Sequence, residues 1–260
     1  MKQIPNLFTL LNLIFGCMAI VLLLQNGITI VETDPSPENP IGQRLELLPE
    51  AVYMAPLFIA LAAVVDFLDG FVARALKASS EMGKQLDSLA DVVSFGVAPS
   101  MIIYQFLRLS FAKTDNGLET AVIWLVPAFI LAGAAAYRLA KFNLDTRQTH
   151  CFRGTPVPSV GMAVAAFPLI YWTSNNATTL NLLTNQWFWY GVVALLSWLM
   201  VSDIPIMSNK PKSLTVQGLL PQISVAATCI ISAIFLGWWA APVTFVAFVL
   251  FSIVFKNRIQ

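Results

Sequence analysis

The sequence predicts an all-α polytopic integral membrane protein, and three observations support this fold class. Hydrophobic residues make up 57% of the 260 residues and charged residues only 11%, whereas soluble domains have about 45–50% and about 25%. The hydrophobic residues occur in runs near the ~20 residues that one membrane-spanning helix needs. The formal net charge of +1 excludes the basic surface with which proteins bind nucleic acid. We expect a single membrane domain over residues 1–260 and no nucleic-acid partner.

Eight hydrophobic runs, separated by polar or turn-rich stretches, each predict one membrane-spanning helix. In chain order they are 7–25, 52–74, 83–107, 121–140, 157–174, 187–205, 218–236 and 240–256. Only Lys2 precedes the first run, which is long enough to span, so it is not expected to be a cleaved signal peptide. Segment 26–50 is acidic and rich in proline, and we expect a surface loop there.

The positive charges predict the orientation, because Lys and Arg accumulate in cytoplasmic loops. If the N-terminus is cytoplasmic and eight spans alternate, the opposite side carries only Arg44, Arg108 and Lys113. The cytoplasmic side then carries the other twelve, which are Lys2, Arg74, Lys77, Lys84, Arg138, Lys141, Arg147, Arg153, Lys210, Lys212, Lys256 and Arg258. We therefore expect both termini in the cytoplasm and the protein in the cell (inner) membrane.

Four carboxylates lie inside the second and third predicted spans, at Asp66, Asp69, Asp87 and Asp91. Each ionised carboxylate there costs at least about 2.5–3.5 kcal/mol, and the four would repel one another. The spacings of three and four residues place each pair on one helix face. In an antiparallel hairpin all four converge at one depth, just below the cytoplasmic surface.

Four convergent carboxylates predict an oxygen-only site for hard divalent cations, and they could offset the charge of two Mg²⁺ or Mn²⁺ ions. Gly70 and Ala73 leave the same face without bulk, and Gly83 opens the approach to the third span. Arg74 at the helix end can bind a phosphate bidentately. The alternatives are polar helix packing, or the ion relay of a cation-coupled membrane transporter.

The spacing of these residues resembles the signature of the CDP-alcohol phosphatidyltransferase family. Eight residues at fixed offsets carry the resemblance, in the pattern Asp66-x2-Asp69-Gly70-x2-Ala73-Arg74-x8-Gly83-x3-Asp87-x3-Asp91. Three further segments extend it: residues 4–9 (IPNLFT), 137–143 (YRLAKFN) and 152–158 (FRGTPVP). The last two are similar to the phosphatidylserine synthase branch, where Lys141 and Thr155 are small departures.

The resemblance implies that CDP-diacylglycerol and L-serine give phosphatidylserine and CMP. It implies that Asp66, Asp69 and Asp87 hold the metals, and that Asp91 completes the cage and acts as the general base on the serine hydroxyl. Such a base is needed because a hydroxyl is a poor nucleophile near neutral pH. Metal ions on the diphosphate would stabilise the departing CMP.

The resemblance also assigns binding residues and partners. CDP-diacylglycerol is expected to contact Asn6, Thr9, Gly70, Ala73, Arg74, Ser80 and Gly83. For serine, Arg138 is the first candidate for the carboxylate, followed by Lys141, Asn143 and Arg153. Membrane lipids and a second copy in a homodimer are the further partners implied. A sister enzyme using glycerol 3-phosphate or inositol phosphate remains an alternative.

Overall fold

The structure, a computed structural model, describes residues 4–25, 29–32, 44–76, 80–113, 120–144, 152–207 and 216–255. Helices dominate this part of the chain. They are α1 (Ile4–Leu24), α2 (Glu50–Ala75), α3 (Glu81–Asp91), the π-helix η1 (Val92–Val97), α4 (Ala98–Ala112), the 3₁₀ turns η3 (Val122–Trp124) and η4 (Val126–Phe129), α5 (Ile130–Leu144), α6 (Val157–Thr173), α7 (Ala177–Leu183), α8 (Gln186–Val201), α9 (Val216–Leu236), the 3₁₀ turn η5 (Gly237–Trp239) and α10 (Ala240–Val254).

Two short ribbons depart from the predicted all-α fold. In segment 26–50, β1 (Thr29–Glu32) pairs antiparallel with β2 (Arg44–Leu47), while residues 26–28 and 33–43 lie outside the described part. In the second ribbon β3 (Phe152–Arg153) pairs antiparallel with β4 (Pro205–Ile206). The first ribbon lies in the segment expected to be a surface loop. The second lies between predicted spans except for Pro205, which was expected at the end of the span 187–205.

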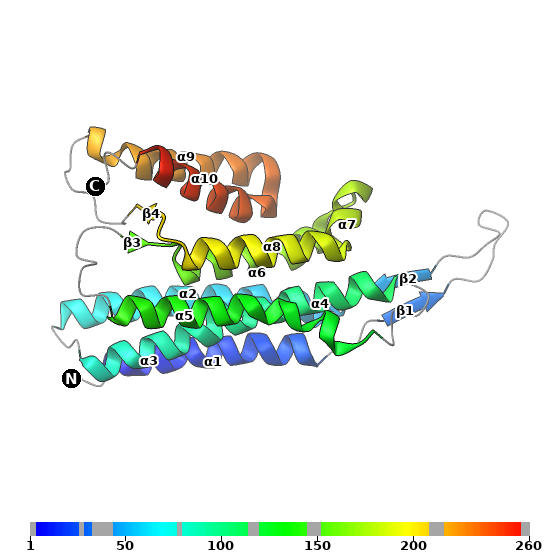
Figure 1. Ribbon diagram of the computed structural model, residues 1–260, viewed down its shortest axis with the longest axis horizontal. Coiled ribbons are helices and arrows are strands. Elements are labelled where there is room, and N and C mark those ends of the chain that lie inside the picture. Colours follow the sequence, from blue (N-terminus) through cyan, green and yellow to red (C-terminus); the bar gives the residue numbers. More distant parts are fainter. Residues whose placement is uncertain are drawn as a thin grey trace.

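The main helices lie side by side in a bundle and alternate in direction along the chain (Figure 1). The β1–β2 ribbon and α7 lie at one end, and β3 and β4 lie at the other (Figure 1). The start of α1 and the end of α10 share the β3–β4 end (Figure 1). A continuous apolar core joins the helices, with Phe95, Phe106 and Trp189 among its largest fully buried side chains.

Helices occupy all eight predicted ranges, and several are apolar enough to cross a membrane. Within the described residues, five stretches have the required length and composition: Pro5–Leu24, Glu50–Ala75, Glu81–Ala112, Val122–Leu144 and Leu220–Val254. Val157–Thr173 and Gln186–Val201 are apolar but shorter. The chain thus has the apolar helices of a membrane protein. The eight-span count and the orientation stay predictions, and Lys2, Lys77, Arg147, Lys210, Lys212, Lys256 and Arg258 of the charge count lie outside the described residues.

Three predicted spans differ from the observed helices in detail. The range 83–107 is not one α-helix, because the π-helical turn η1 separates α3 from α4. The range 121–140 begins with 3₁₀ turns that contain Pro127, since proline removes a backbone donor from a regular helix. The range 187–205 ends early, at Val201, before Pro205 enters β4. The residue before a proline disfavours helical dihedrals, which explains the early end.

Glycines allow two helices to approach η1 closely. A Cβ atom on Gly16 of α1 would lie 2.8 Å from the Cα atom of Ser94, and one on Gly161 of α6 would lie 3.0 Å from the Cα atom of Phe95. Both contacts are with backbone atoms, which a side-chain rotation cannot relieve. The turn after Asp91 is therefore held between α1 and α6.

We expect Gly16→Ala to destabilise the protein, because the added methyl group forces α1 away from η1. Overpacking of this kind costs about 1–3 kcal/mol, which should appear as a lower Tm of the purified protein in detergent. Gly133→Ala is the matched control, since a Cβ there has no atom of the described residues within 4 Å. Equal Tm values for the two variants would contradict the close approach.

Candidate active site

Three of the four predicted carboxylates converge between α2 and α3. One oxygen each from Asp66, Asp69 and Asp87 lies within 4.8 Å of the other two. Asp69 is buried, whereas Asp66 and Asp87 are half-buried. We call these three residues the carboxylate triad. Asp91 lies beside the triad, close enough for the charge of each member to act on its carboxylate. The convergence expected from the spacing is thus observed for the triad.

Helix α1 contacts this group of acids with two side chains one turn apart. The Thr9 hydroxyl donates to Asp69 Oδ2 at 2.8 Å, and Asn12 Nδ2 donates to Asp91 Oδ1 at 3.3 Å. Both α1 residues are buried. One carboxylate from α2 and one from α3 are therefore each oriented by a donor from α1.

Asn12 was not among the residues expected at the site. The sequence does contain a pattern that indicates Asn12: Asn6, Thr9 and Asn12 recur every three residues in an otherwise apolar run. Residues with this spacing share a helix face. A polar stripe on a hydrophobic helix must face protein interior or a polar cavity. The periodicity of the stripe is therefore sufficient to predict which face of α1 packs against polar groups.

The residues expected to bind CDP-diacylglycerol lie around the triad. Arg74 is exposed and folds over Gly70, with its Nη1 3.4 Å from the position of a Cβ on that glycine. Asn6 lies next to Gly83, where a Cβ would be 3.2 Å from Asn6 Oδ1. Ser80 has a structural task as well, because its hydroxyl caps α3 by accepting from the Gly83 amide at 3.0 Å. Ala73 lies on α2, one residue before Arg74. Their binding roles stay predictions.

Arg138, the first candidate for the serine carboxylate, interacts with Asp91. It is buried on α5, and its positive charge interacts favourably with the negative charge of Asp91. Its Nη2 donates to the Gly154 carbonyl oxygen at 3.2 Å, while its buried Nε has no partner among the described residues. A buried guanidinium with an unused donor is suited to bind a carboxylate.

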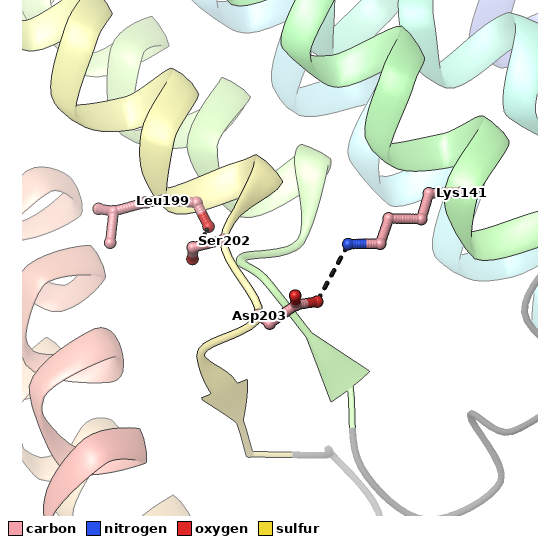
Figure 2. A network of polar contacts seen from close by, with 4 residues as sticks. All are labelled: Lys141, Leu199, Ser202 and Asp203. Atoms are coloured by element: carbon pink, nitrogen blue, oxygen red, sulfur yellow. Dashed lines mark hydrogen bonds and ion pairs between the residues drawn. The ribbon is translucent and has the colours of Figure 1, made fainter.

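The other three candidates for serine have different surroundings. Lys141 forms an ion pair of 3.0 Å with Asp203, beyond the end of α8, and both side chains are substantially exposed (Figure 2). Asn143 Nδ2 donates to Ser88 Oγ at 2.8 Å, which joins α5 to α3. Arg153 lies in β3, with its side chain outside the described part. None of these contacts was expected from the sequence.

The triad suits a divalent metal ion. Its ligands are carboxylate oxygens, the donors that Mg²⁺ and Mn²⁺ prefer. One of them, Asp87 Oδ1, is buried and has no hydrogen-bond partner among the described residues. A buried carboxylate oxygen without a donor is unfavourable while it is charged, and a bound cation would offset that charge. The residues present therefore fit the metal that the sequence predicts.

Comparison with known proteins identifies the family. The family model for CDP-alcohol phosphatidyltransferase matches residues 2–199. A CDP-diacylglycerol–serine O-phosphatidyltransferase of Bacillus subtilis is 32% identical over 66% of this chain and 78% of that protein. Proteins of the same name from Helicobacter pylori and Mycobacterium leprae are 36% and 31% identical. These two alignments cover 58% and 80% of this chain, and 59% and 67% of the respective relatives. This chain belongs to the CDP-alcohol phosphatidyltransferase family.

Proposed function

We propose that this protein transfers a phosphatidyl group from CDP-diacylglycerol to the hydroxyl of L-serine, which gives phosphatidylserine and CMP. The observation that carries the proposal is the carboxylate triad with Asp91 beside it. Arg74 interacts with Asp69 of the triad, and the buried Arg138 interacts with Asp91. The names of the relatives support serine as the acceptor. Glycerol 3-phosphate and inositol phosphate would both bring an additional phosphate to the site, and the names do not favour them.

In the proposed reaction Asp91 is the general base. Its carboxylate takes the proton from the serine hydroxyl as the oxygen attacks the phosphorus that bears diacylglycerol. The bond from this phosphorus to the CMP oxygen breaks, and its electron pair leaves with CMP. Asp66, Asp69 and Asp87 would hold the metal, with Asp91 completing the cage. Mg²⁺ or Mn²⁺, two per site, would neutralise the diphosphate and stabilise the leaving group.

The remaining site residues bind the two substrates in this proposal. Arg74 pairs with the diphosphate, since a guanidinium binds phosphate oxygens bidentately. Around it, CDP-diacylglycerol contacts Asn6, Thr9, Gly70, Ala73, Ser80 and Gly83. Arg138 holds the serine carboxylate. Lys141 and Asn143, at the same end of α5, and Arg153, in β3, provide further contacts to serine.

We further propose a single membrane domain of eight spans, with both termini and the active site facing the cytoplasm of the cell membrane. The alternating direction of the helices supports this topology (Figure 1). So does the concentration of Lys and Arg in the loops on one side. The homodimer implied by the family resemblance stays a prediction.

The test of the proposed function is release of CMP by the full-length protein, purified in detergent and incubated with CDP-diacylglycerol and Mn²⁺. We expect release that depends on L-serine and produces phosphatidylserine. Release that depends instead on glycerol 3-phosphate or inositol phosphate would reassign the acceptor. Release with none of the three would favour transport, which ion flux into proteoliposomes would then measure.

We expect Arg138→Ala to raise the KM for serine at least about 10-fold, because hydrogen bonds to a charged group contribute about 1.5–3 kcal/mol. The KM for CDP-diacylglycerol should change less than threefold. Initial-rate kinetics with each substrate varied in turn measure both constants. Arg108→Ala is the matched control: Arg108 bonds Gln105 within α4, at 3.2 Å. Equal effects of Arg138→Ala on both KM values would argue against a contact with serine.

A further inference from the structure

We propose that Asn12 is a positioning residue that orients the Asp91 carboxylate for proton transfer, an inference that rests on the proposed function. Asn12 has no exposed surface, and its Nδ2 donates to Asp91 Oδ1 at 3.3 Å. The hydrogen bond joins two residues 79 positions apart, on helices that pack against each other. It fixes one carboxylate oxygen of Asp91, and with it the orientation of the carboxylate plane.

The energetics of the amide argue for a functional role. Asn12 Oδ1 is buried and has no hydrogen-bond partner among the described residues. An unpaired buried amide oxygen destabilises a protein, and it does so most in an apolar helix. Leucine at this position would avoid that cost and match the neighbours of Asn12 in α1. What asparagine adds is the donated hydrogen bond to Asp91.

The backbone around Asn12 is fixed, so that the amide has a defined direction. Ser94 Oγ donates to the Asn12 carbonyl oxygen at 3.0 Å, and Ser94 belongs to the π-helical turn that follows Asp91. One turn further along α1, Gly16 allows the close contact with the same serine. A second contact, between α1 and the turn that directly follows Asp91, therefore holds the donor and the acceptor of the Asn12–Asp91 bond together.

The two donors of α1 act on different acids. Thr9 bonds Asp69, a member of the carboxylate triad, whereas Asn12 bonds Asp91, which lies outside the triad. Loss of the Asn12 amide should therefore impair proton transfer, while the three carboxylates of the triad and the Thr9 bond to Asp69 stay in place to hold the metal. A positioning role for Asn12 therefore predicts an effect on proton transfer, whereas a general structural role predicts an effect on the whole site.

The experiment compares Asn12→Leu and Asn12→Ala with wild type in the full-length protein. Leucine keeps the branched shape and the number of heavy atoms of asparagine and alanine leaves a cavity, so that the two variants share only the missing amide. We expect kcat for CMP release to fall about 10- to 100-fold in both, as misplacement of a reacting group does, with both KM values within threefold of wild type. The rise in Tm on adding Mn²⁺, measured without substrate, should persist in both variants, because the triad keeps its three carboxylates.

Ser100→Ala is the matched control, since it removes another fully buried polar group and its hydrogen bond to the Gly96 carbonyl oxygen at 2.8 Å. It should lower Tm and leave kcat near the wild-type value. Three results would overturn the proposal: kcat of a folded Asn12 variant within twofold of wild type, kcat values that simply follow Tm across all three variants, or loss of the Mn²⁺-dependent rise in Tm. If one Asn12 variant does not fold, the other decides.

The wild-type protein distinguishes failure of this inference from failure of the proposed function. If wild type releases CMP with serine, the Asn12 variants test the positioning role alone. If wild type uses another acceptor, the proposed function fails, and the same comparison of variants is made with that acceptor. If wild type releases no CMP with any acceptor, both the proposed function and this inference are refuted.

Discussion

Replacing Asp91 with asparagine is expected to abolish serine-dependent CMP release while leaving CDP-diacylglycerol binding largely intact. Asparagine matches aspartate in size, and its amide oxygen can still accept from Asn12 Nδ2, the donor to Asp91 Oδ1 in wild type. It cannot take a proton from the serine hydroxyl. General base catalysis contributes about 10²–10⁴-fold, so turnover should fall at least 100-fold. Radiolabelled CMP release and equilibrium binding of CDP-diacylglycerol measure the two effects separately.

The control for Asp91→Asn removes another carboxylate from the same helix. Glu81 lies in the first turn of α3 and is exposed, so Glu81→Gln should retain wild-type turnover. If Asp91→Asn keeps more than a tenth of the wild-type rate, Asp91 is not the base. If it loses CDP-diacylglycerol binding as well, Asp91 contributes mainly to holding the lipid substrate.

Removing divalent metal is expected to stop the reaction and to destabilise the folded protein. With an excess of EDTA, CMP release should fall at least 100-fold, and Mn²⁺ or Mg²⁺ should restore it. The three triad oxygens, which lie within 4.8 Å of one another, repel when no cation lies among them. Mn²⁺ should therefore raise the Tm of wild type by several degrees, while the double variant Asp66→Asn, Asp69→Asn should lose this response.

Glu50→Gln serves as the control for the metal experiment, because Glu50 is an exposed carboxylate in the first turn of α2, the helix that carries Asp66 and Asp69. Its Tm should respond to Mn²⁺ as that of wild type does. Full activity in EDTA, with no metal detected by mass spectrometry in the purified protein, would contradict a metal-dependent site.

The sequence was sufficient for those features that depend on local spacing. Asp66 and Asp69, three residues apart, and Asp87 at the facing position of the next helix converge as the helical repeat requires. The bond from Asn12 to Asp91 and the ion pair of Lys141 with Asp203 join residues 79 and 62 positions apart. Such pairings follow from how helices pack against each other, which a helical period does not determine.

Backbone irregularity escaped prediction for a different reason. The run 83–107 is apolar beyond its first turns, and no proline marks the place where η1 begins. A π-helical turn depends on neighbours that hold it open, here α1 at Gly16 and α6 at Gly161. Hydrophobicity alone predicts the span and cannot predict a change of helical pitch within it.

The π-helical turn η1 has a consequence for how the enzyme tolerates changes in chain length. A π-helix closes its hydrogen bonds over one more residue than an α-helix, so η1 sets the angular phase between the acids of α3 and the packing face of α4. Deleting one residue within Val92–Val97 would restore a regular α-helix and rotate one segment by about 100° relative to the other. Either Asp87 and Asp91 would leave the site, or α4 would turn its buried face outward. Length is therefore constrained at this turn as tightly as residue identity is among the acids.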